Sequence, residues 1–242
     1  VNAWPLDEGL IDYVAPSYGN ESEENPLYAA NIIGNPSLRL GKSVNAQVID
    51  KALIANSLNE AEGVETNVAR GYHAIEFLLW GQDLNGTSSG AGKRPATDFD
   101  SDNCTGGNCD RRADYLLAAT ELLIDDLTWM VEQWREKGAA RNAITNGDTK
   151  SDLRKNIATI FTGMGSLSYG ELAGERMRLG LLLHDPEEEH DCFSDNTHWS
   201  HYNDVLGIQN VYSGNYTRAD GSVMTGPSLS DLVAGAAPDS VS

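Results

Sequence analysis

The stretch RRADYLLAATELLIDDLTWMVEQWREK, residues 111–137, decides the fold class of this sequence. Apolar side chains recur in it at spacings of three and four residues, which places them along one face of an α-helix. The residues of this stripe are Leu116, Ala119, Leu123, Leu127, Met130 and Trp134. A helix of this length reaches roughly 40 Å at 1.5 Å per residue, which is typical of helical bundles.

Similar helical patterns occupy most of the remaining chain. We expect further helices over about 43–57, 65–80, 151–183 and 194–212, and a short last one from about Ser228. Residues 1–43 are punctuated by prolines and are expected to be irregular, and no stretch shows the sustained alternation of a β-strand. The sequence therefore predicts an all-α fold.

The composition restricts the class of function. The chain has 242 residues, of which 36 are acidic and 17 basic, so its formal net charge is −19. Hydrophobic residues make up 40%, which is enough for a buried core. The sequence offers no basic stripe to neutralise phosphates, which argues against nucleic-acid binding, and an acidic surface attracts cations instead. No apolar run is long enough to span a bilayer.

Two of the three cysteines lie close together. Cys104 and Cys109 share one Gly-rich loop, NCTGGNC, and are near enough for a small disulfide ring, which leaves Cys192 over. A local disulfide of this kind suggests an oxidising compartment.

The sharpest candidate for chemistry is GYHAIE, residues 71–76. His73 and Glu76 are three residues apart on an expected helix, so their side chains share one face. An imidazole nitrogen and a carboxylate oxygen placed in this way can hold one metal ion. The alternative is a His–Glu hydrogen bond that joins two helices.

A second pair has the same spacing near the expected start of another helix. Asp195 and His198 would complete a set of two carboxylates and two imidazoles, which suits iron, zinc or manganese. The alternative is that Ser194 or Asp195 caps this helix.

A third group lies on the helix expected over 151–183. Glu171 and Glu175 are four residues apart, and Arg176 is able to hold a carboxylate and orient a ligand. The alternative is surface charge on an exposed helix.

Two other acidic stretches resemble metal sites less well. Residues 98–102 begin like a calcium loop, but Asn103 and Cys109 stand where an EF-hand needs Gly and Glu. The segment HDPEEEH, residues 184–190, is expected to be a solvated acidic loop, because Pro186 disrupts helical spacing. No nucleophile elbow or phosphate loop is found, so we assign no catalytic residue.

Several stretches together resemble the imelysin family, whose members are also called imelysin-like or iron-regulated protein A-like. They are NAWPLDEGLIDY (2–13), GYHAIEFLLWGQD (71–83), SYGELAGERM (168–177), CFSDNTH (192–198), GIQNVYSGNY (207–216) and PSLSDLV (227–233). The family's G-x-H-x-x-E motif falls on Gly71, His73 and Glu76.

The resemblance implies two packed four-helix bundles. We expect residues 1–150 to form the first, with an irregular N-terminal segment and the motif helix, and 151–242 to form part of the second. Family proteins are usually longer at both ends, so we expect both bundles to be incomplete and further N- and C-terminal segments to belong to the protein.

The resemblance also implies a function and a location. It suggests a bacterial protein that is periplasmic, cell-surface or secreted, lipid-anchored in its full-length form, and linked to iron. Two activities belong to the family: metal binding in iron uptake, with a membrane iron-transport component as partner, and a metal-dependent peptidase. A zinc peptidase typically needs three protein ligands, an open position for water and a general base. The H-x-x-E pair supplies two ligands and no evident base, so we favour iron binding.

The expected ligand set is therefore His73, Glu76, Asp195 and His198, with Glu171, Glu175, Arg176 and Ser194 as neighbours that orient ligands or balance charge. Iron is the expected ion, with zinc or another divalent metal as alternatives. A structural helical module without metal is the third interpretation.

Overall fold

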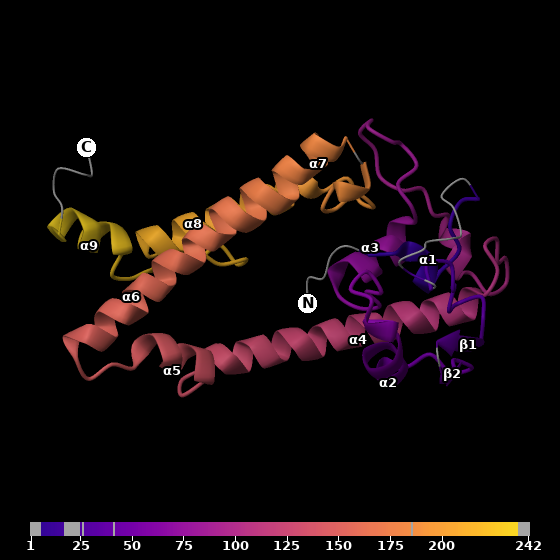
Figure 1. The fold of residues 1–242 in the computed structure, drawn as a ribbon, viewed down its shortest axis with the longest axis horizontal. Coiled ribbons are helices and arrows are strands. Elements are labelled where there is room, and N and C mark those ends of the chain that lie inside the picture. Colours follow the sequence, from indigo (N-terminus) through magenta and orange to yellow (C-terminus); the bar gives the residue numbers. More distant parts are fainter. Residues whose placement is uncertain (1–5, 17–24, 26, 41, 185, 237–242) are drawn as a thin grey trace. The chain divides into compact units, whose positions relative to one another are not determined.

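In the part of the chain that the structure describes, helices are joined by loops and by two short β-hairpins (Figure 1). A computed structural model describes residues 6–16, 25, 27–40, 42–184 and 186–236. The predicted all-α class is confirmed. The chain divides into two compact units: unit 1 is Val1–Thr145 with Asp185–Asn196, and unit 2 is Asn146–His184 with Thr197–Ser242. The segment Asp185–Asn196 thus belongs to unit 1, although we expected it to form part of the second bundle together with the rest of residues 151–242.

Unit 1 is built around one long helix. Its helices are α1 (Glu8–Ile11), α2 (Lys51–Leu53, continued by a π-helical turn, Ile54–Leu58), α3 (Tyr72–Trp80), α4 (Cys109–Trp134) and α5 (Ala139–Thr145). Three short 3-10 helices cover Ala61–Gly63, Ala96–Phe99 and Pro186–Glu188. The N-terminal part is less irregular than expected, because β1 (Ser37–Leu40) pairs with β2 (Lys42–Asn45) as an antiparallel hairpin that runs from Ser37 opposite Asn45 to Leu40 opposite Lys42.

The long helix α4 buries only its first half. Ala119 and Leu123 of the predicted stripe are buried and Leu116 packs against the core, whereas Leu127, Met130 and Trp134 are exposed. The core of unit 1 collects side chains from α1, the 32–33 segment, α2, α3 and α4; the largest completely buried ones are Leu10, Ile11, Ile32, Ile33, Ile54, Leu58, Phe77, Leu78, Tyr115 and Phe193. This core holds α3 in place.

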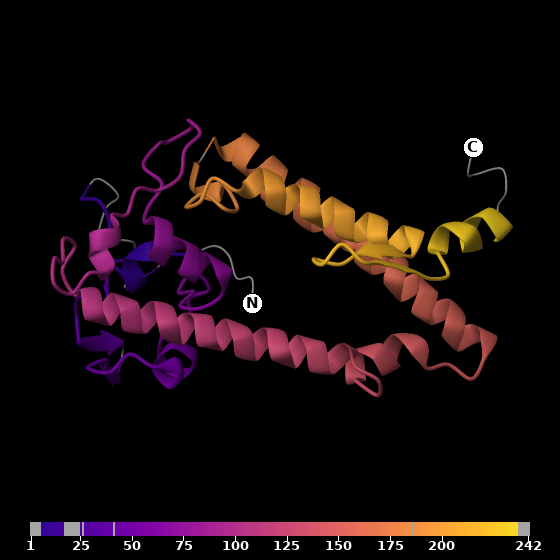
Figure 2. The same cartoon turned by 180° about the vertical axis from the view of Figure 1, so that it is seen from behind.

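Unit 2 consists mainly of two long helical runs that lie side by side (Figures 1 and 2). The first joins α6 (Lys150–Gly165), a π-helix (Ser166–Arg178) and α7 (Leu179–Leu183), and the second is α8 (Thr197–Ser213). Thr149 caps α6 in a capping box with Asp152, two residues before the expected cap. A hairpin of β3 (Asn215–Thr217) and β4 (Val223–Thr225) and the short α9 (Leu229–Ala236) follow. Leu172 is the one buried residue among those described in this unit.

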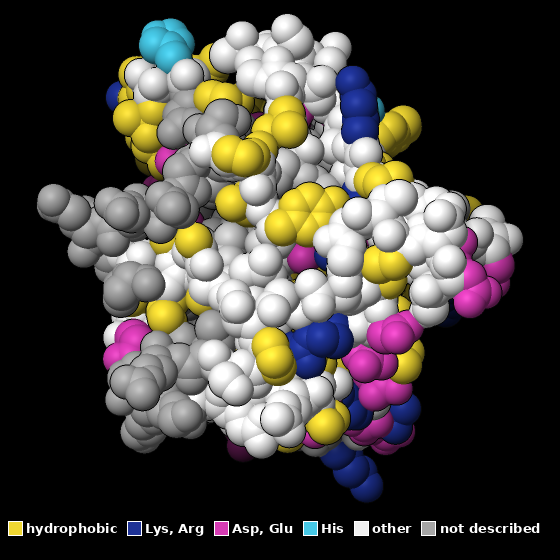
Figure 3. All heavy atoms as spheres, turned by 90° about the vertical axis from the view of Figure 1, so that its right-hand side faces the viewer, with side chains coloured by type: hydrophobic (Ala, Val, Ile, Leu, Met, Phe, Trp, Pro, Cys, Tyr) yellow, Lys and Arg dark blue, Asp and Glu magenta, His cyan; other side chains and the backbone are white. Residues whose placement is uncertain are grey.

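The two units differ in charge. Unit 1 holds 28 of the 36 acidic and 11 of the 17 basic residues, so it carries −17 of the net −19. In the space-filling view of Figure 3, acidic side chains gather mainly along one edge of the visible face. Among the described residues, no helix is both long and apolar enough to cross a bilayer.

A buried network of charged side chains ties the N-terminal segment to α4. Arg112 donates to both oxygens of Asp12, from Nε at 2.6 Å and from Nη2 at 3.1 Å. Arg94 Nη1 donates to Asp12 at 2.8 Å and to Asp98 at 3.1 Å. Each of these four side chains is at most 2% exposed. Charge-assisted pairs of this geometry offset the cost of burying the ions.

The network fixes the protonation of two groups at its edge. Burial disfavours the charged form of Asp98, but hydrogen bonds from Tyr13 and Thr105 and the positive charges of Arg112 and Arg94 outweigh it and hold the pKa of Asp98 below its usual value. Burial, together with the hydrogen bond to Asp98, raises the pKa of Tyr13 to about 12. Asp98 is therefore part of the charged network, and its carboxylate accepts hydrogen bonds from Tyr13, Arg94 and Thr105.

Candidate metal centre

Helix α3 carries the first two residues of the site. Gly71 precedes the helix with a φ of 96°, a conformation that favours glycine, and His73 and Glu76 follow on one helical face. His73 is 1% and Glu76 8% exposed. The neighbouring Phe77 and Leu78 are completely buried and anchor the helix, so both polar side chains are held inside unit 1.

The two oxygens of Glu76 have different partners. Oε2 lies 2.9 Å from His73 Nδ1. Oε1 accepts hydrogen bonds from the Ser194 backbone N–H at 2.9 Å and from its hydroxyl at 2.5 Å. Ser194, which the sequence proposed as a neighbour of the site, therefore fixes the orientation of the Glu76 carboxylate.

Asp191 supplies a third ligand atom from a distant segment. Its Oδ1 lies 4.0 Å from His73 Nδ1. One ligand atom from each of His73, Glu76 and Asp191 lies within 4.8 Å of the other two. Ions such as zinc bind nitrogen and oxygen at about 2.0–2.2 Å, which places neighbouring ligand atoms roughly 3–4 Å apart. One nitrogen and two carboxylate oxygens at these separations fit a transition-metal ion after small side-chain adjustments.

His190 lies against the same group. Its ring centroid is 4.7 Å from that of His73 in an edge-on arrangement, and the residue is 6% exposed. The segment 184–190 was expected to be a solvated acidic loop, and this is wrong for its last residue. The reason is that Cys192 and Phe193, which follow directly, are buried in the core and draw the chain inward.

The second predicted pair does not form one helical face. Asp195 adopts a φ of 56° in the turn before α8, which begins only at Thr197, so the helical spacing between Asp195 and His198 is lost. His198 is exposed and belongs to unit 2, and its ring lies 5.7 Å from that of Trp199. Neither residue is in the three-membered group, which instead contains Asp191, four residues before Asp195, and a role for Asp195 and His198 in metal binding stays a prediction.

Of the residues proposed on the helix of unit 2, Arg176 pairs with a carboxylate outside the candidate site. Arg176 Nη1 donates to Asp204 Oδ2 at 2.9 Å, and its Nη2 lies 3.9 Å from Glu171. Glu171 and Glu175 are exposed. This arginine therefore links the π-helix to α8, and a role for Glu171, Glu175 and Arg176 in metal binding stays a prediction.

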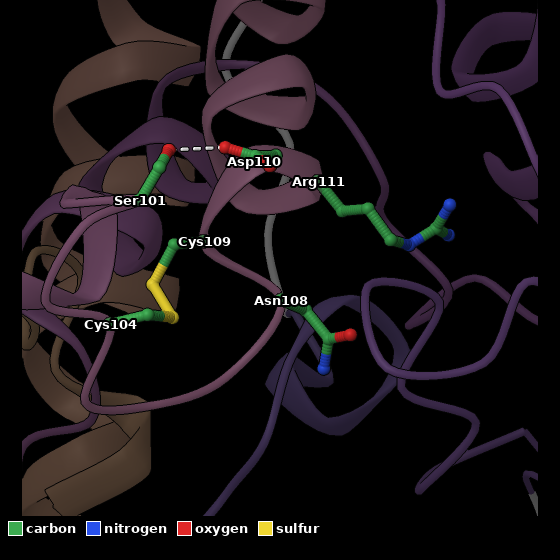
Figure 4. A pocket seen from close by; sticks show the side chains of 6 residues that line it. All are labelled: Ser101, Cys104, Asn108, Cys109, Asp110 and Arg111. Carbon is green, nitrogen blue, oxygen red and sulfur yellow. Dashed lines mark hydrogen bonds between the residues drawn. A yellow bond between two sulfur atoms is a disulfide. The ribbon is translucent and has the colours of Figure 1, made fainter.

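The expected disulfide closes the loop before α4 (Figure 4). Cys104 and Cys109 are bonded with their Cα atoms 5.9 Å apart, and Cys192, which lies outside this bond, is buried. Ser101 donates a hydrogen bond to Asp110 beside it, as Figure 4 shows. The cavity at this place, about 340 Å³, is lined by Ser101, Cys104, Asn108, Cys109, Asp110 and Arg111 and contains none of the candidate ligands.

Asp191 is absent from the predicted ligands because those were placed on expected helices, whereas Asp191 lies in the turn that precedes α8. One sequence signal points to Asp191. In His190-Asp191-Cys192-Phe193, two residues of types that bind metal ions come directly before two apolar residues, and these two pack in the core.

Comparison with known proteins identifies a family. A family model described as Imelysin matches residues 1–242, the whole chain. No curated protein matches the sequence.

Proposed function

Because this chain belongs to the imelysin family, we propose that it binds a transition-metal ion, iron in the first place, through His73, Glu76 and Asp191. The observation that carries this proposal is the approach of the three ligand atoms to within 4.8 Å of one another inside unit 1. Zinc or another divalent metal is the alternative cargo, since one imidazole and two carboxylates suit several such ions.

The chemistry of the group favours a doubly charged ion. Two ionised carboxylates and one neutral imidazole would bring two negative charges to a largely buried place, and a divalent cation would neutralise them. Ser194 holds Glu76 Oε1, which leaves Oε2 facing His73 as the oxygen available to the ion. The charge of −17 on unit 1 attracts cations from a distance, an effect that salt weakens.

The proposed biological role is metal acquisition outside the cytoplasm. The disulfide between Cys104 and Cys109 supports an oxidising compartment, such as the periplasm or the cell surface. In this role the protein would pass its ion to a membrane iron-transport component.

Metal-dependent peptide hydrolysis is the second candidate, and one observation favours it. Asp191 raises the number of protein ligands to three, the number that a catalytic zinc site typically has. The two functions share the ligands but differ in turnover: the peptidase requires chelator-sensitive cleavage of unfolded polypeptides, and the binding protein does not.

Calorimetric titration with Zn²⁺ and, without oxygen, Fe²⁺ tests the proposal. We expect Asp191→Asn and His73→Ala to weaken binding by more than about 100-fold, because loss of a ligand should exceed the roughly 10–100-fold effect of losing a group that orients one. Asp195→Asn is the matched control in the same turn and should bind like the wild type. If His73→Ala lowers the melting temperature but the wild type binds no metal, the pair of His73 and Glu76 has only a structural role.

A further inference from the structure

The candidate metal centre is assembled from two parts of the chain. His73 and Glu76 lie on α3, whereas Asp191 and Ser194 lie in a turn; Ser194 is 118 positions from Glu76. Two hydrogen bonds from Ser194 to Glu76 join these two parts directly, and a metal ion requires their separation to be held to about 0.5 Å.

We propose that residues 92–94 act as a clamp that holds the two parts of the metal centre at the separation needed for binding. This inference rests on the proposed function. The clamp makes one backbone hydrogen bond to each side: the Gly92 N–H donates to the Phe193 carbonyl at 2.8 Å, and the Arg94 N–H donates to the Trp80 carbonyl at 2.8 Å. Phe193 lies between Asp191 and Ser194, and Trp80 is the last residue of α3.

Gly92 is required by close packing on the end of α3. A Cβ atom at this position would lie 2.4 Å from the Trp80 carbonyl oxygen, 2.6 Å from that of Gly81 and 2.9 Å from that of Gln82. All three are backbone atoms, so no side chain can rotate to make room. Any larger residue would push the clamp away by roughly 1 Å to restore van der Waals contact, which is more than a metal site tolerates.

Arg94 anchors the other end of the clamp in the buried charge network. Its Nη1 donates to Asp12 and Asp98, and the guanidinium lies 5.3 Å from the ring centroid of Phe77, the residue that follows Glu76. Phe77 in turn contacts the ring of Phe193, with centroids 5.3 Å apart. Arg94 and Gly92 are therefore positioning residues: they touch the elements that carry the ligands and not the ligands themselves.

The test compares Gly92→Ala with Gly163→Ala, a substitution in α6 that meets no atom within 4 Å. The first measurement is a titration with Co²⁺ followed by its visible spectrum, which reports both affinity and coordination geometry. We expect Gly92→Ala to weaken Co²⁺ binding by at least about 10-fold and to alter the spectrum, whereas Gly163→Ala leaves both unchanged. Wild-type affinity and spectrum in Gly92→Ala would overturn the proposal.

The second measurement, hydrogen exchange of residues 190–196 in the metal-free protein, separates the clamp from the proposed function. We expect the Ser194 amide, which donates to Glu76, to exchange faster in Gly92→Ala than in the wild type and in Gly163→Ala. If the wild type binds no Co²⁺, the proposed function fails, but faster exchange in Gly92→Ala still supports the clamp and unchanged exchange refutes it.

A second variant covers the case in which Gly92→Ala does not fold. Arg94→Lys keeps the positive charge between Asp12 and Asp98 but loses the planar group next to Phe77. We expect the variant to fold with a melting temperature below that of the wild type and to bind Co²⁺ at least about 3-fold more weakly. Co²⁺ binding equal to the wild type would contradict the role of Arg94.

Discussion

Replacing Ser194 with Ala tests how the metal centre is held in shape. The substitution removes the hydroxyl that donates to Glu76 Oε1 at 2.5 Å and keeps the backbone N–H that donates to the same oxygen at 2.9 Å. A hydrogen bond to a charged group contributes about 1.5–3 kcal/mol. If this hydrogen bond stabilises the metal-bound protein but not the metal-free protein, its loss lowers the affinity for the metal by roughly 10–100-fold. This is the range known for groups that orient metal ligands.

Isothermal titration calorimetry with Zn²⁺ at constant pH measures this change. The matched control is Ser101→Ala, because Ser101 also donates its hydroxyl to a carboxylate, that of Asp110, which is not one of the candidate ligands. We expect the control to bind Zn²⁺ with wild-type affinity. A dissociation constant for Ser194→Ala within about 2-fold of the wild type would refute the reasoning, because Glu76 would then need no support from its neighbour.

Three further predictions concern stability. Arg112→Met leaves a buried carboxylate without its main partner and should lower the free energy of unfolding by about 3–5 kcal/mol in urea titrations; a loss below about 1 kcal/mol would contradict the importance of the network. Because the pKa of Tyr13 is raised to about 12, its contribution to the free energy of unfolding is complete below pH 10 and is lost as pH rises from about 10 to 12. Because the pKa of Asp98 is lowered, its contribution to the free energy of unfolding is lost as pH falls below about 4. Thermal unfolding across pH should show both declines. A shallower decline above pH 10 in Tyr13→Phe than in the wild type identifies the first, because burial also raises the pKa of Tyr115, which stays in the variant. Replacing Cys104 and Cys109 together by Ser should cost about 2 kcal/mol, the loop-closure entropy of so short a ring, and an equal melting temperature with and without reductant would argue against the bond.

Local sequence patterns predicted the helices well and their ends less well. The three- and four-residue spacing of α4 follows from helix geometry alone, so the element was predictable. Which half of its stripe is buried was not, because Leu127, Met130 and Trp134 are as apolar as the residues that pack in the core. Burial depends on where the other elements lie, and helical periodicity does not contain that information.

The candidate site also has a part that the sequence predicts and a part that it does not. His73 and Glu76 are one helical turn apart, so their proximity follows from their spacing. Asp191 and the clamp residue Gly92 reach the site only through tertiary packing of segments far apart in sequence. Asp195 was paired with His198 because the helix was expected from about Ser194, three residues before α8 begins, and a turn with positive φ carries no strong sequence signal at an aspartate.

The central claim is that one ion binds between His73, Glu76 and Asp191. An anomalous difference map from crystals grown with Zn²⁺ tests it most directly, because the map locates the metal independently of any assumption about its ligands. We predict one strong peak about 2.0–2.2 Å from a nitrogen of His73 and from carboxylate oxygens of Glu76 and Asp191. A peak at Asp195 and His198 with none at Glu76, or no peak within unit 1, would contradict the claim.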